Sequence, residues 1–231
     1  MINCELQAAL AEAKAKGSLL EISEEFLLNL VHSALSFDDN NLKIEEVENV
    51  LKGQYVGVNS EKVRRITNQK NAFERIVAMA KEGIELTEDE LKDLHQILME
   101  GFNIPGGLYR NVDISVKGSN HTPCSYIKVY DRMEKYINYI KEGPKEDVLE
   151  YISYCHLQLA KIHPFLDGNG RLARLVLNYE LMSNGFAPVI ITSDERDKYH
   201  NALEQFKVEK EIEPFKQYLS ELELKSIKKY Y

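Results

Sequence analysis

Apolar residues recur at spacings of three and four along almost the whole chain. Such spacing gathers them on one face of an α-helix, so most of the chain is predicted to form amphipathic helices. Helix-ending glycines follow several periodic stretches, as at Gly17, Gly53, Gly83 and Gly185. We therefore expect a mainly α fold, with helices near residues 3–16, 23–35, 42–51, 60–82, from Thr87 onward, and near 129–141, 144–162, 171–184, 193–207 and 213–228.

One stretch departs from the helical pattern. Residues 102–108 contain Pro-Gly-Gly, and Val112, Ile114 and Val116 then alternate with other residues ahead of a Gly-Ser-Asn turn. Alternation with a period of two is typical of a strand, and glycine marks the turns between strands. We predict a small β-hairpin between about residues 109 and 128.

Composition excludes several classes of protein. No apolar run in the 231 residues approaches the length of a membrane span, so we expect no membrane partner. A net charge of −8 disfavours general binding to nucleic acid through phosphates. The three cysteines are scattered and odd in number, which favours reduced thiols and a cytoplasmic location.

The segment KIHPFLDGNGRLAR, residues 161–174, separates two predicted helices. Pro164 disfavours helical geometry at His163, so the first helix is expected to end at that histidine. Gly168 and Gly170 lead into the next helix, where backbone N–H groups and the helix dipole favour an anion. A neutral histidine near pH 7 suits a general base.

Charged residues strengthen the case for a phosphate site in this segment. Arg171 and Arg174 are three residues apart, so both project from nearly one face of the first helical turn. Cations at the positive end of a helix dipole are unfavourable unless an anionic ligand supplies negative charge. Asp167 is a carboxylate suited to Mg²⁺, which needs little more from a protein when phosphate oxygens are present.

Each of these features alone has a plainer explanation. A histidine at a helix end is more often a cap, a glycine pair is more often a turn, and two arginines usually lie on a solvated face. No folding requirement asks for all of them together, so a phosphate site is favoured. The pattern matches neither a Walker P-loop nor a zinc site. We interpret His156, expected to face outward from its helix, as structural.

The segment HPFLDGNGRLAR resembles the defining motif of the Fic (filamentation induced by cAMP) family, HPFx(D/E)GNGRxxR, with every specified position matched. PGGLYR resembles the flap region of that family, and RLVLNYELMSNGFAP resembles its helix after the motif. The resemblance implies a Fic-type helical bundle with a small β-hairpin flap. It implies an N-terminal helical segment, residues 1–58, which includes an inhibitory helix, and a catalytic core, residues 59–231.

Members of this family usually transfer AMP from ATP to a protein hydroxyl, with Mg²⁺ as cofactor. The resemblance implies that His163 is the catalytic base, that Asp167 holds the metal, and that Asn178 supports the nucleotide site. Gly168, Asn169 and Gly170 would form the anion hole, and Arg171 and Arg174 would bind phosphates. It also implies that the flap docks the target, through Val112, Ile114, Val116, Ser119 and His121.

The expected partner is a protein with a hydroxyl acceptor on Tyr, Ser or Thr. Self-modification is open as well, and a homodimer is common enough among members of the family to be considered, although no residue of this sequence requires it. Other readings stay open: the enzyme could use another nucleotide or phospho donor, it could remove AMP from a target, or the chain could be a catalytically silent, nucleotide-sensing interaction module. An intact His163 argues against the last of these.

Many family members carry an inhibitory helix with the pattern (S/T)xxxE(G/N), whose glutamate pairs with the second motif arginine. In the candidate region, HSALSFDDNNLKIEEVENVL, Asp38 stands where the glutamate is expected. Ala34 takes the serine or threonine position and Asp39 the glycine position. Aspartate is shorter than glutamate by one methylene, and a bidentate grip on a guanidinium is sensitive to such a displacement. We predict that this helix lies near Arg174 and restrains it weakly.

Overall fold

The computed structural model of the protein describes residues 4–17, 19–37, 41–116, 118–144 and 146–231, and within these it is helical without any strand. No helix in this part of the chain combines the length and the apolar character that crossing a bilayer would require. The helices are α1 (Cys4–Lys16), α2 (Glu24–Ser36), α3 (Ile44–Leu51), α4 (Ser60–Glu82), α5 (Glu88–Met99), η1 (Tyr126–Lys128), α6 (Val129–Glu142), α7 (Val148–Ile162), α8 (Asn169–Ser183), η2 (Ser193–Glu195), α9 (Arg196–Glu209) and α10 (Glu213–Tyr230).

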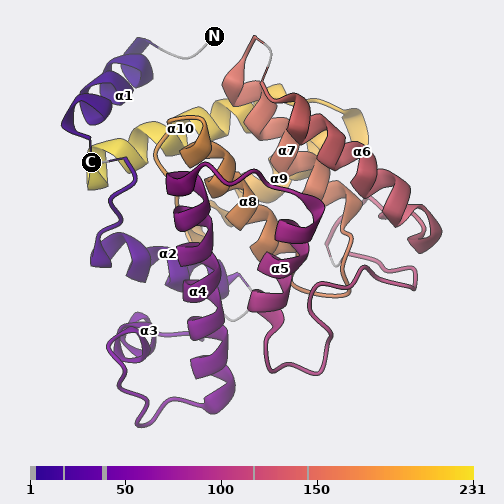
Figure 1. Cartoon of the computed structure of the whole chain (residues 1–231), viewed down its shortest axis with the longest axis horizontal. Helices are drawn as coiled ribbons and strands as arrows, with labels where there is room; N and C mark the ends of the chain where they lie inside the picture. Colours follow the sequence, from indigo (N-terminus) through magenta and orange to yellow (C-terminus); the bar gives the residue numbers. More distant parts are fainter. Residues whose placement is uncertain (1–3, 18, 38–40, 117, 145) are drawn as a thin grey trace.

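Helix α8 lies at the centre of the molecule. It packs along α7 and α4 and also contacts α5 and α2 (Figure 1). Almost every side chain from Leu172 to Met182 is buried, whichever side of the helix it leaves from. A helix that is covered on all sides has little freedom to shift. Its N-terminal end, which follows the candidate motif, is therefore held in a fixed position.

The N-terminal segment packs onto the rest of the fold. Helix α1 lies beside α10, and α2 packs against α4 and α8 (Figure 1). Leu6 and Phe26 belong to the same hydrophobic core as Phe215 near the other end of the chain. The division into residues 1–58 and 59–231 stays a prediction, because the two parts share one core.

Several predicted helix ends are confirmed and two are shifted. The helix predicted from Thr87 onward is confirmed: Thr87 accepts a hydrogen bond from the Glu90 N–H at the start of α5, and the Glu90 carboxylate pairs with Arg75 of α4. The helix predicted to begin near residue 144 begins at Val148, because Asp147 caps it. The helix predicted from residue 171 begins earlier, at Asn169, since Gly168 already accepts the first helical hydrogen bond.

The predicted β-hairpin is wrong. The described residues between 109 and 128 contain no strand and end in the short helix η1. The carbonyl groups of Val112 and Cys124 accept hydrogen bonds from the buried guanidinium of Arg110, so they do not pair across a ladder. Val112 is 48% exposed, which shows that the alternating apolar residues do not cover a sheet face.

Candidate functional site

The junction between α7 and α8 is tightly turned. His163 ends α7 in a left-handed backbone conformation, with φ of 52°. Its carbonyl accepts a hydrogen bond from Nε of Arg110 at 2.9 Å, and the carbonyl of Pro164 accepts from the Arg110 backbone N–H at 2.9 Å. The prediction that the helix ends at His163 is confirmed. A non-glycine residue in this conformation persists only where its surroundings hold it there.

The imidazole of His163 is arranged as a proton acceptor. Its Nδ1 lies 3.3 Å from the Ala160 carbonyl, which can only accept a hydrogen bond, so we assign the proton to Nδ1. Nε2 then carries the lone pair. Burial, reinforced by the charges of Lys207 and Arg110, lowers the pKa of His163 to about 4, and the ring is therefore neutral near pH 7.

The loop of residues 164–168 is held in shape by hydrogen bonds from its own side chains and from Asn169, which follows it. The Asn169 amide accepts from the Phe165 N–H and donates to the Phe165 carbonyl, both at 2.9 Å. Phe165 is fully buried and anchors the loop in the core. The Asn169 side chain thus shapes the loop, while its backbone N–H lies in the first turn of α8.

The N-terminus of α8 has no side-chain cap, because Gly168 occupies the N-cap position. N–H groups in a first helical turn have no carbonyl partner within the helix. Gly168 has φ of 76°, and a Cβ at this position would lie 3.1 Å from Met99 Sδ and 3.2 Å from His95 Nε2. Glycine is required here both by its backbone conformation and by the close approach of α5.

His95 on α5 was not identified from the sequence. Its Nδ1 accepts a hydrogen bond from the Gly107 N–H at 2.9 Å, so Nε2 carries the proton and donates to the Asp167 carbonyl at 2.9 Å. The ring stacks on Phe165 with centroids 3.7 Å apart. Burial lowers the pKa of His95 to about 4, and its neutral form joins the motif loop to the Pro-Gly-Gly segment.

Arg110 was also missed as a site residue, although it closes the PGGLYR segment. Its side chain is buried and donates to the carbonyls of His163, Val112 and Cys124. A fixed guanidinium can bind three carbonyls that lie far apart in sequence. Sequence offers one signal for both residues: an arginine and a histidine near a glycine pair that precedes the motif.

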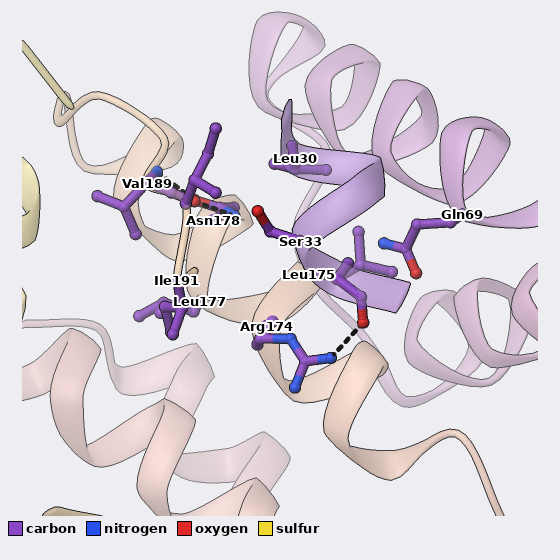
Figure 2. Close-up of a pocket in the computed structure, with 11 residues that line it drawn as sticks. Leu30, Ser33, Gln69, Arg174, Leu175, Leu177, Asn178, Val189 and Ile191 are labelled. Carbon is purple, nitrogen blue, oxygen red and sulfur yellow. Dashed lines mark hydrogen bonds between the residues drawn. The ribbon is translucent and has the colours of Figure 1, made fainter. Parts of the chain in front are cut away.

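The two motif arginines have different surroundings. Arg171 is buried, and its Nη2 lies 3.7 Å from Met99 Sδ. Arg174 reaches towards α2, where its Nη2 donates to the Ala34 carbonyl at 2.9 Å (Figure 2). Its guanidinium carbon lies 4.5 Å from the centre of the Phe37 ring. The expectation that α2 lies near Arg174 is therefore confirmed. Asp38 and Asp39 lie outside the described residues.

Asn178 lies further along α8, beside a crevice between α2, α4 and α8 that Arg174, Ser33 and Gln69 also line (Figure 2). Its side-chain amide donates to the Val189 carbonyl at 3.1 Å and accepts from the Val189 N–H at 2.7 Å. Asn178 thereby fixes the segment that follows α8. Its role in nucleotide binding stays a prediction.

His156 was expected to face outward and instead is fully buried. Its Nδ1 donates to the Ala173 carbonyl at 2.9 Å and its Nε2 accepts from the Tyr199 hydroxyl at 3.1 Å. Helix α7 packs against α8 on one side and against α9 and α10 on others, so its periodicity revealed only one of its buried faces. A structural role is consistent with this position.

A cavity of about 380 Å³ opens at the junction, and we call it the junction cavity. Residues 166–171 line it together with His163 and Arg174, so the structure brings the predicted base, the glycine loop and both arginines together. Its volume falls in the range of small-molecule sites. Further charged or titratable side chains come from α9, which the sequence did not indicate: Arg196, His200, Glu204 and Lys207.

The residues predicted to dock the target do not lie together in the structure. Val116 and Ser119 line the junction cavity, whereas His121 lines a neighbouring cavity. Val112 is exposed and Ile114 half-buried. Glu204 of α9 holds the segment, accepting from Ser119 Oγ at 2.5 Å and from the Asn120 N–H at 2.8 Å. A target-docking role for these residues stays a prediction.

The cavity fits a magnesium ion only in company with phosphates. Among the described residues, no group of three His, Cys, Asp or Glu side chains could hold a metal ion. Two carboxylates line the cavity, and Glu204 is engaged by residues 119 and 120. Asp167 accepts from the Gly168 N–H through Oδ1 at 2.7 Å. One carboxylate beside phosphate oxygens matches the usual protein contribution to bound Mg²⁺.

The sequence model of the Fic/DOC family matches residues 85–181, from just before α5 to near the end of α8. A protein described as "Protein adenylyltransferase Fic" from Drosophila persimilis is 26% identical over 223 residues, which cover 94% of this chain and 43% of that protein. Its counterpart from Drosophila grimshawi is 28% identical, with coverages of 94% and 45%. The chain thus spans less than half the length of these relatives.

Solved structures with the same fold agree. A Fic domain containing signaling protein from Bacteroides thetaiotaomicron superposes with a TM-score of 0.86 at 24% identity, covering 97% of this chain and 94% of that one. Fic-1 from C. elegans gives a TM-score of 0.81 at 21% identity, covering 98% of this chain and 70% of that one. At such identities the likeness concerns the fold alone.

Proposed function

Because the chain carries a domain of the Fic/DOC family over residues 85–181, we propose that it is a protein adenylyltransferase. It would move AMP from ATP to the hydroxyl of a Tyr, Ser or Thr side chain in a protein target. One observation carries this proposal. The neutral imidazole of His163 and the uncapped N-terminus of α8 border the same cavity of about 380 Å³.

In the proposed reaction, the acceptor oxygen attacks the α-phosphorus of ATP. The bond between that phosphorus and the oxygen bridging to the β-phosphate breaks, and pyrophosphate leaves. The hydroxyl proton passes to Nε2 of His163, whose Nδ1 proton is held by the Ala160 carbonyl. Backbone N–H groups of the first α8 turn and the guanidinium of Arg174 would stabilise the charge on the phosphate oxygens.

Mg²⁺ would be held by Asp167 and the nucleotide phosphates, and when bound it supplies Lewis-acid stabilisation of phosphate charge. His95 has a positioning role in this scheme. By donating to the Asp167 carbonyl it fixes the backbone that carries the carboxylate. Asn169 has a similar role, because its amide closes the loop on Phe165.

We assign target docking to the segment of residues 112–121, including Val112, Ile114 and Val116. The backbone of this segment would bind an extended piece of the target through main-chain hydrogen bonds, a mode that tolerates many sequences. The Ser119 contact with Glu204 supports this by holding the segment at the rim of the cavity. Self-modification and a homodimer are further proposals. Cys4, Cys124 and Cys155 are free, which supports a reducing location such as the cytoplasm.

We further propose that α2 restrains the enzyme. Arg174 cannot fully engage a phosphate while its Nη2 donates to Ala34 and its plane faces Phe37. Phe37→Leu keeps an apolar side chain and removes the ring, so self-modification with labelled ATP should rise a few-fold, consistent with about 1 kcal/mol of cation–π energy. Asp38→Gly tests the inhibitory position. Equal rates in both variants and the parent would contradict a restraint by α2.

The activity is tested by incubating the purified protein with Mg²⁺, a cell lysate and ATP labelled at the α-phosphate. Labelled protein carrying the added mass of AMP is the expected product. His163→Asn removes the base yet retains a residue that accepts left-handed geometry, so labelling should fall roughly 10²–10⁴-fold with the fold intact. Unchanged labelling would refute the assigned base. Parallel reactions with other nucleotides, with γ-labelled ATP and with pre-adenylylated protein distinguish the alternative activities.

A further inference from the structure

A second cavity, of about 400 Å³, lies beside the junction cavity and shares none of its lining residues. Ser119 lines the first cavity and His121, two residues later, lines the second. Helices α6 and α7 and the region where α9 meets α10 complete the wall. We call this the basic cavity, after the three cationic side chains that line it: Arg132, Lys161 and Lys210.

Among the residues that the structure describes, these three cations have no acidic partner. Within the described residues, no Asp or Glu lines the basic cavity, and no ion pair includes any of the three. Nearby acids are engaged elsewhere: Asp131 pairs with Lys135 at 2.9 Å, and Glu213 pairs with Lys216 at 2.8 Å. Glu209 and Glu211 flank Lys210 in sequence without lining the cavity. The positive charge there is therefore not neutralised within this part of the chain.

Lys161 is held in place by the fold. Its Nζ donates to the Lys207 carbonyl at 2.9 Å and lies 5.3 Å from the centre of the Phe206 ring. Burial and the adjacent ammonium of Lys210, followed by Arg132 and Lys207, lower the pKa of Lys161 to about 8. An anion between the two lysines would relieve this repulsion. Nε2 of His121 is also buried there without a hydrogen-bond partner among the described residues.

The backbone at Lys210 strengthens the case for a ligand. Lys210 ends α9 with φ of 69°, and His163 is the other described non-glycine residue with a left-handed backbone. Helix ends of this kind favour glycine or asparagine. A lysine here opposes the backbone preference, and its exposed side chain adds a third cation to a cavity that already holds two. Local rules are typically broken in this way at functional positions.

We propose that the basic cavity binds a phosphate-type oxyanion, held between Lys161 and Lys210 with Arg132 as the third cation. A carboxylate would neutralise one of the three charges, whereas a phosphate group carries about −1.5 to −2 near neutral pH and matches the cavity better. This site is separate from the proposed AMP transfer and does not depend on it. The phosphate could be a free ion or a group on a phosphorylated side chain.

The test is a titration of the ¹⁵N-labelled full chain with inorganic phosphate, followed by NMR at each backbone amide. Binding in the basic cavity shifts the amides of residues 121, 122, 124 and 207–212, and binding in the junction cavity shifts those of residues 167–171. Lys210→Asn should lower the phosphate affinity reported by the basic-cavity amides roughly tenfold or more. It removes a charge-assisted hydrogen bond while keeping a residue suited to this backbone. Lys161→Met is the second variant, with the same expectation.

Lys81→Met, which removes an exposed charge on α4, is the matched control and should bind phosphate as the parent does. A phosphoserine peptide that binds more tightly than free phosphate would identify a protein-borne ligand, and weaker binding would identify a free ion; both support the site. Shifts confined to residues 167–171, equal affinity in Lys210→Asn and the parent, or equal binding of acetate and phosphate would each overturn the proposal.

Discussion

The loop of residues 163–170 and the segment of residues 109–125 both border the junction cavity, yet different kinds of contact hold them. In the loop, Asn169 binds the backbone of Phe165 and Asp167 binds the N–H of Gly168, so partners lie within four residues of each other. In the segment, Arg110 binds the carbonyl of His163, and Glu204 binds residues 119 and 120 from α9.

This difference explains which region was predictable. Asn169 and Asp167, which close the loop on itself, are part of the motif, so the local pattern of residues carries much of its conformation, and His95 and Arg110 then brace its backbone from outside the motif. The segment takes its shape from contacts to distant helices, and its local alternation of Val112, Ile114 and Val116 wrongly indicated strands. Contacts over long sequence separations form only in the folded chain, where they must offset a larger entropy of closure.

Arg110→Met should have the largest effect on stability. It leaves the carbonyls of His163, Val112 and Cys124 without their donor, which we expect to lower the free energy of unfolding by roughly 3–5 kcal/mol. Urea denaturation measures the loss. Arg64→Met is the control, since Arg64 binds one carbonyl, that of Gly101, at the surface and should lose less than about 1 kcal/mol. Equal losses would mean that the segment is not held by Arg110.

His95 connects the loop to the Pro-Gly-Gly segment through two hydrogen bonds and should make the stability of the protein depend on pH. Its pKa lies near 4 in the folded protein and near 6.5 in an unfolded chain, so the unfolded state takes up the proton first as the pH falls. Stability is therefore lost between pH 6.5 and 4, by at most about 3 kcal/mol. His95→Gln can keep both hydrogen bonds without titrating. Thermal unfolding should show a shallower acid decline for this variant, and parallel curves would contradict the assignment.

Asn169→Ala probes the locally closed loop. Loss of both bonds to the Phe165 backbone should lower the free energy of unfolding by about 2 kcal/mol. Asn138→Ala on α6, an exposed site, is the matched control and should change stability by less than about 0.5 kcal/mol. A loss as small as that of the control would show that the loop is closed by something other than Asn169.

Glu204→Gln should have the smallest effect on stability, and that effect should be confined to the segment of residues 109–125. Glutamine can keep one of the two hydrogen bonds to the segment but loses the ion pair with Lys207 at 3.3 Å, so about 1 kcal/mol of local stability is expected to be lost. Hydrogen exchange at the Asn120 amide should accelerate roughly five-fold while that at Asn169 stays constant. Glu209→Gln, an exposed neighbour on α9, should leave both amides unchanged. Faster exchange in the loop as well would show that the two regions open together.

Periodicity predicted the helices well, and tertiary packing corrected their details. The end of α7 at His163 follows from Pro164, and the start of α5 at Thr87 follows from its capping side chain. His156 was assigned to the wrong side because α7 is buried on several sides at once. The Glu90 carboxylate pairs with Arg75 because α4 happens to lie beside α5.

From the sequence by itself came the helical class, the turn after α7, and the set of residues that could handle a phosphate. These depend on backbone preferences and on chemistry within a few residues. The tertiary structure alone decided that His95 and Arg110 brace the loop, that Ala34 and Phe37 engage Arg174, and that three cations share a second cavity. Such contacts join distant parts of the chain, often through backbone carbonyls, which every residue possesses and which leave no mark in a sequence.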